Sequence, residues 1–140
     1  MTGWGPKVLD GGGGGQPSIP GDGPLPDPSK STFNRITAVP ANVETDLLVF
    51  PVPATPIIHL VRIDFGGENI GNYKLYEGAT QQAEYFTWFN GPGLTATWDF
   101  TDTKGGGVAL TPSSILKVTV EHWRPFLGPF FARMQYREIL

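Results

Sequence analysis

Glycine and proline interrupt this chain so often that a mostly helical fold is excluded. The 140 residues include 19 Gly and 14 Pro, which cost roughly 1 and 3 kcal/mol, respectively, in the interior of a helix. The interruptions recur along the whole sequence, so no helix of useful length is expected. Short strands joined by turns are the structure that such spacing favours.

Composition also argues against several functional classes. A net charge of −3 and a pI of about 5.2 argue against nucleic-acid binding, which needs a basic surface. The absence of cysteine excludes disulfides, thiolate zinc sites and a cysteine nucleophile. No apolar run approaches the ~20 residues of a membrane span, and the N-terminus lacks the hydrophobic region of a signal peptide. We expect a soluble protein of roughly one domain that binds neither nucleic acid nor membrane.

Residues 1–31 differ from the rest of the chain. They hold 9 of the 19 Gly and 6 of the 14 Pro, and only six apolar residues. Such a segment buries too little surface to offset its ordering entropy, so by itself it should be disordered. One interpretation is a flexible, disordered tail. We favour an extended interaction arm, which at ~3.3 Å per residue could span on the order of 100 Å. Its predicted partner-binding anchors are Trp4, Val8, Leu9 and Leu25.

Residues 32–140 alternate between apolar and polar side chains in short runs, as strands with one buried face do. In residues 114–123, Leu116, Val118 and Val120 share one face, and in residues 94–100 the polar face is Thr95, Thr97 and Asp99. Residues 130–137 alternate in the same way. In residues 57–65 the alternation places His59 on the inward face with Val61 and Ile63.

Weaker strand signals lie at residues 32–39, 46–52, 73–77, 83–90 and 108–110, and Gly or Pro separates the runs. Eight or nine strands at this spacing predict an antiparallel β-sandwich of the jelly-roll type, preceded by the Gly/Pro-rich N-terminal arm. The expected organisation is therefore an arm at residues 1–31 and an all-β domain at residues 32–140.

No catalytic constellation is visible in the sequence. His59 and His122 both fall on apolar strand faces, where a histidine is more often a hydrogen-bonded core or rim residue than a catalyst. Residues 66–71 have the glycine spacing of a phosphate-binding loop, but Asn72-Tyr73 follow in place of Lys-Ser/Thr. Asp99 and Asp102 lack the later bidentate acid of a calcium loop. We expect neither an enzyme nor a cofactor or metal site.

Aromatic side chains occupy both faces of the run Tyr85 to Phe89, and Trp123 falls on the outward face of its strand. Either the fold covers both faces, or one face contacts another molecule. We predict that Phe86, Trp88 and Trp123 bind a partner, because aromatic residues are enriched in protein interfaces. A sugar-stacking platform is the alternative, for which Trp98 is the poorest candidate because of its inward position. The platform residues would be Tyr85, Trp88, Trp98 or Trp123.

Four segments carry a resemblance to a known class of proteins. They are LVFPVPA at residues 48–54, LVRIDF at 60–65, GNYKLYEG at 71–78 and VTVEHWRPFLG at 118–128. In this order, over roughly residues 46–140, they resemble small all-β structural proteins of tailed bacteriophages. The N-terminal arm agrees with this resemblance, since capsid cement proteins send extended arms across neighbouring subunits.

The resemblance implies a capsid decoration (cement) protein that stabilises the shell by binding coat subunits through its β-domain and arm. Its partners would be coat protein or other virion proteins, it would form a homo-oligomer, and it would reside in the virion after assembly in the host cytoplasm. A tail, neck or baseplate component is the first alternative. A carbohydrate-binding or receptor-binding module is the second. The resemblance implies no catalytic residues in this sequence.

Overall fold

The structure, a computed structural model, describes residues 4, 6–11, 30–67, 70–87, 95–101, 107–124 and 128–139. These residues form two antiparallel sheets packed face to face, with no helix among them. The first sheet has the order β1-β7-β4-β10-β2, and β8 pairs with β4 beside this path. The second has the order β3-β9-β5-β6.

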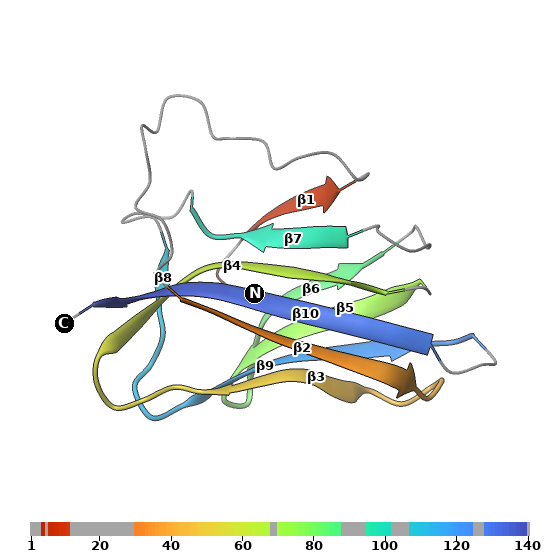
Figure 1. Cartoon of the computed structure of the whole chain (residues 1–140), viewed down its shortest axis with the longest axis horizontal. Helices are drawn as coiled ribbons and strands as arrows, with labels where there is room; N and C mark the ends of the chain where they lie inside the picture. The colour runs from red at the N-terminus through yellow and green to blue at the C-terminus, as the bar shows by residue number, and fades with distance from the viewer. Residues whose placement is uncertain are drawn as a thin grey trace.

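The strands of the first sheet are β1 (Lys7–Gly11), β2 (Lys30–Val39), β4 (Ile57–Gly67), β7 (Thr95–Asp99), β8 (Val108–Ala109) and β10 (Gly128–Ile139). The strands of the second sheet are β3 (Thr45–Pro51), β5 (Gly71–Glu77), β6 (Thr80–Phe86) and β9 (Ile115–His122). In Figure 1 the red β1 lies beside β7 at one edge of the first sheet, and the orange β2 lies on the other side of β4 and β10.

The pairing is nested. β2 pairs with β10, β3 with β9, β4 with β7 and β8, and β5 with β6. The chain is therefore one long antiparallel ribbon that turns at the β5–β6 hairpin, where Gly78 adopts a φ of 63° that favours glycine. Wrapping this ribbon places β4 beside β10 and β5 beside β9. This is the jelly-roll topology, and it confirms the predicted sandwich.

The core lies between the sheets and is rich in aromatic residues. The ring of Phe65 is central, with centroids 4.3 Å from Trp98 and 4.5 Å from Tyr73. All three side chains are fully buried. Each such aromatic ring removes roughly 150–250 Å² from water, which at about 25 cal/mol per Å² corresponds to several kcal/mol of hydrophobic stabilisation. These packed rings fix the position of one sheet relative to the other, and therefore also the relative positions of the two outer faces.

The open sides of the sandwich are closed by side chains at both edges. At one edge the ring of Trp4 contacts Phe100 edge-on at 5.8 Å, and its backbone N–H donates to the Gln82 carbonyl of β6. At the other edge Asn34 of β2 donates to the Leu47 carbonyl of β3 at 2.7 Å. Trp4, near the N-terminus, thus packs against the sandwich of its own chain.

The expected phase of β4 is wrong at His59. Pairing with β10 shifts register between Gln135 and Tyr136, opposite Arg62 and Leu60. Because of this bulge, Leu60 and Ile63 both reach the core, although three positions separate them. His59 therefore lies on the other side, half-buried. Val61, at the bulge, is buried but lies outside the core cluster.

Candidate interaction surfaces

Two of the predicted partner-binding residues, Phe86 and Trp123, lie together on the molecular surface. Phe86 ends β6 and Trp123 follows β9, and their rings stack with centroids 5.6 Å apart and planes 24° apart. The stack leaves Phe86 52% and Trp123 47% exposed. The two residues are far apart in sequence, and only the jelly-roll wrapping places the ends of their strands near each other.

Polar groups surround this stack on the outer face of the second sheet. Asn72 of β5 stands in register with both Phe86 and Glu121, and its amide donates to the Glu84 carboxylate at 2.7 Å. Because partners in antiparallel register share a face, these side chains project to the same side. We call Asn72, Glu84, Phe86, Glu121 and Trp123 the acidic aromatic surface. It offers apolar rings, carboxylates and an amide side by side.

Farther along the same face, the Glu44 carboxylate accepts hydrogen bonds from Thr119 at 2.6 Å and Tyr76 at 2.7 Å. The Thr119 hydrogen bond is the main reason that the pKa of Glu44 lies below its ordinary value. Partial burial, followed by the neighbouring Glu44, raises the pKa of Tyr76 to about 12. Lys117 lies over the Tyr76 ring and pairs with Asp46 at 3.5 Å. This face therefore carries several ordered charged groups.

A second aromatic stack lies on the outer face of the first sheet. Phe33 of β2 and Phe131 of β10 stack with centroids 6.1 Å apart, and Phe33 is 57% exposed. Arg133 stands in register with Phe33, and Arg35 with Phe131. We call Phe33, Arg35, Phe131 and Arg133 the basic aromatic surface. This surface was not predicted from the sequence. The available signal is the adjacent pair Phe130 and Phe131, because neighbouring side chains on a strand point to opposite faces and one of the two rings must lie outside the core.

Beside the basic aromatic surface, Asp64 of β4 is almost completely buried, with 6% of its surface exposed. Its carboxylate accepts hydrogen bonds from Thr97 at 2.6 Å, Arg133 at 2.8 Å and Arg62 at 3.1 Å. Burial by itself would raise the pKa of Asp64, but these hydrogen bonds and the charge of Arg62 outweigh it and hold the pKa below its ordinary value. Asp64 thereby fixes the position of Arg133.

The other predicted anchors occupy different places. Trp4 is half-buried against Phe100, as described above, and Val8 is partly exposed on β1. Leu9 belongs to β1, which pairs with β7 of the same chain; its side chain lies outside the described part of the structure. Leu25 and Trp88 are also outside the described residues. Part of the predicted arm is therefore a strand of the chain's own sheet.

Of the residues proposed for sugar stacking, Trp98 is fully buried and Tyr85 packs against the core with its ring 6.2 Å from Phe65. Neither is placed to receive a sugar ring. His122 is buried, its Nε2 donates to the Val39 carbonyl at 2.6 Å, and its ring stacks on Phe130. The expectation of a hydrogen-bonded core histidine is confirmed for His122.

Within the described ranges, no group of three or more His, Asp or Glu side chains converges as a metal site. The same part of the chain contains no helix that is long and apolar enough to cross a membrane. Comparisons with protein-family models, curated proteins and solved structures found no match. The two aromatic surfaces are therefore the candidate binding sites of the described part of the chain.

Proposed function

We propose that this protein is a structural component of a bacteriophage virion, of the capsid decoration or cement type, that stabilises the shell by binding coat subunits. The observation that carries the proposal is a jelly-roll domain with an exposed aromatic stack on its outer surface, formed by Phe86 and Trp123. Jelly rolls occur in viral capsid and lectin domains, and exposed Trp residues are frequent interface hot spots. The sequence resemblance to phage structural proteins points in the same direction.

The N-terminal arm is the second part of the proposed binding mechanism. β1 hydrogen-bonds along the free edge of β7, which would otherwise present unpaired backbone groups. An arm that binds a coat subunit through Trp4 or Val8 would release its hydrogen bonds to β7. It would form similar backbone hydrogen bonds with the coat subunit instead. Trp4, Val8, Leu9 and Leu25 remain the predicted anchors of the arm.

Binding to purified virions that lack the protein tests this function. We expect the full chain to bind with hundreds of copies per particle, and Trp123→Ser to weaken binding at least tenfold while the fold is retained. Binding of about six to twelve copies, as in a symmetric ring, would instead identify a neck, tail or baseplate component. Failure to bind any part of the particle would contradict a virion role.

The acidic aromatic surface also favours a second candidate function, the binding of a carbohydrate or glycosylated receptor. Trp123 and Phe86 present apolar rings, and Asn72 and Glu84 present hydrogen-bonding groups next to them. Sugar recognition combines these two elements. A glycan array with the full chain tests it, with Trp123→Ser as the control variant. Binding that Trp123→Ser abolishes would support this candidate, and a blank array would reject it.

A further inference from the structure

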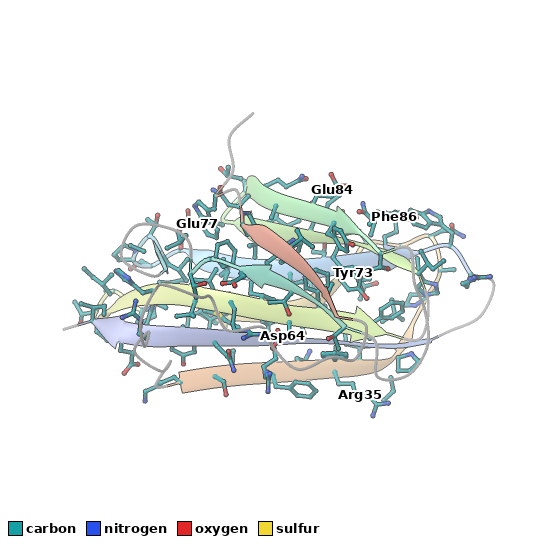
Figure 2. The ribbon with its side chains drawn as sticks, turned by 90° about the horizontal axis from the view of Figure 1, so that it is seen from above. Arg35, Asp64, Tyr73, Glu77, Glu84 and Phe86 are labelled. Carbon is teal, nitrogen blue, oxygen red and sulfur yellow. The ribbon has the colours of Figure 1, made fainter. Side chains whose placement is uncertain are left out.

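We propose that copies of this protein associate head to tail, with the basic aromatic surface of one copy packed against the acidic aromatic surface of the next. The two surfaces lie on opposite outer faces of the sandwich, because one belongs to the first sheet and the other to the second. Figure 2 shows Arg35 at one side of the molecule and Glu84 and Phe86 at the opposite side.

Charge complementarity is the first support for this contact. On the outward positions of β2, β4, β7 and β10, four arginines accompany two aspartates, which are buried. On the outer face of the second sheet, four carboxylates accompany two lysines. The first set is Arg35, Arg62, Arg133, Arg137, Asp64 and Asp99. The second set is Glu44, Asp46, Glu84, Glu121, Lys74 and Lys117.

These charges select between modes of self-association. Two first-sheet faces placed against each other would bring arginines together, and two second-sheet faces would bring carboxylates together. Like-charge juxtaposition costs several kcal/mol in an interface. Opposite faces attract each other, and Arg35 on β2 is exposed and so free to meet an acid of the neighbouring copy. The charge pattern therefore favours the head-to-tail contact over a two-fold dimer.

The two aromatic stacks are the second support. Phe33 with Phe131 and Phe86 with Trp123 each leave about half of a large ring in water. Burying two such rings against each other removes apolar surface at the centre of the contact, while the charged residues form its rim. This is the usual anatomy of a protein interface, in which Trp, Phe and Arg are enriched. The two surfaces are thus complementary in charge, and each offers an exposed aromatic ring to the other.

A contact between different faces is heterologous, so it repeats from copy to copy and produces a closed ring or an open stack. The proposed contact goes beyond the virion role, because it joins copies of this chain and applies equally to a head decoration and a tail ring. It is tested with the purified full chain alone. Because Phe86 and Trp123 belong to both proposed contacts, the basic aromatic surface distinguishes them: a variant that lacks Phe33 and Arg35 should lose self-association and keep its binding to virions.

The experiment uses two variants, each lacking one surface. Phe33→Thr/Arg35→Thr removes the basic aromatic surface, and Glu121→Thr/Trp123→Thr removes the acidic one. We expect the wild-type chain to form oligomers whose mass, measured by light scattering, grows with concentration and falls with salt. Each variant should be monomeric, with a dissociation constant raised at least tenfold. An equimolar mixture should form a one-to-one dimer and nothing larger, because each chain keeps one competent surface.

Circular dichroism verifies that both variants are folded. Lys30→Glu, a charge change at the first residue of β2 and on the opposite strand face from Arg35, is the control that should leave the mass unchanged. If a double variant fails to fold, the single charge reversals Arg35→Glu and Glu121→Arg replace it, and combining both in one chain should restore association. A wild-type chain that is monomeric at every concentration would overturn the proposal. So would a two-fold dimer, or a mixture of variants that stays monomeric.

Discussion

The outer faces of the two sheets both carry a hydrogen-bonded carboxylate, but the two carboxylates are held in different environments. Asp64 on the first sheet is nearly inaccessible and receives hydrogen bonds from two arginines and a threonine. Glu44 on the second sheet is exposed and receives two hydroxyl hydrogen bonds. The cost of losing a hydrogen bond rises as the remaining partners become less able to reach water. The first face therefore contributes to stability through Asp64, and the second leaves its polar groups available for binding.

The largest effect is expected from Asp64→Ala, which removes the acceptor shared by Arg62, Thr97 and Arg133. We expect a loss of about 3 kcal/mol in the free energy of unfolding, because a buried hydroxyl and a half-buried guanidinium lose their partner. Urea unfolding followed by tryptophan fluorescence measures it. A loss below about 1 kcal/mol would mean that water replaces the carboxylate. The carboxylates of the two faces would then contribute equally to stability.

Acidification should remove the same stabilisation without mutation. The pKa of Asp64 is lower in the folded protein than its ordinary unfolded value of about 3.9. Its contribution is therefore present above about pH 4 and is lost as the pH falls through the folded pKa. Unfolding of the wild type and Asp64→Asn in urea at a series of pH values should show the stability gap between them closing below pH 4. A gap that is independent of pH would contradict this assignment.

Glu44→Ala is the matched substitution on the second face and should cost about 1 kcal/mol, because the Tyr76 hydroxyl can turn to water, whereas the buried Thr119 hydroxyl loses its acceptor. The same urea experiment measures it. Tyr76 provides an independent check: without the carboxylate, its pKa should fall from about 12 toward the ordinary value of 10. Absorbance at 295 nm during alkaline titration reports this change. An unaltered tyrosine titration would mean that burial, rather than Glu44, sets the pKa.

A similarly small effect on stability, about 1 kcal/mol or less, is expected from Trp123→Ser, because about half of the side chain already lies in water and its stack with Phe86 is lost. The same substitution should strongly weaken binding to virions. Phe65→Leu, which removes a fully buried aromatic ring from the core, is the contrasting variant and should destabilise without a direct effect on binding. A large loss of stability for Trp123→Ser would show that the exposed stack is structural.

Much of the fold follows from local patterns in the sequence. The alternation of Leu116, Val118 and Val120 correctly predicts the inward face of β9, and it also predicts that Trp123 points outward. Gly and Pro mark the ends of the strands because they cannot continue a regular ladder. The nine strands from β2 to β10 lie close to the predicted segments. Strand β1 was not expected, because its glycine-rich context carries no alternating signal.

The sequence by itself determined which segments are strands and, for most of them, which side chains face inward, because period-two alternation is a local property of the backbone. Only the tertiary structure decided the register. The bulge opposite Gln135 moves His59 out of the core, and the nested pairing brings Phe86 to Trp123 and Asp64 to Arg133. Those contacts join strands that are distant in the chain, so they depend on long-range pairing, which no local pattern encodes.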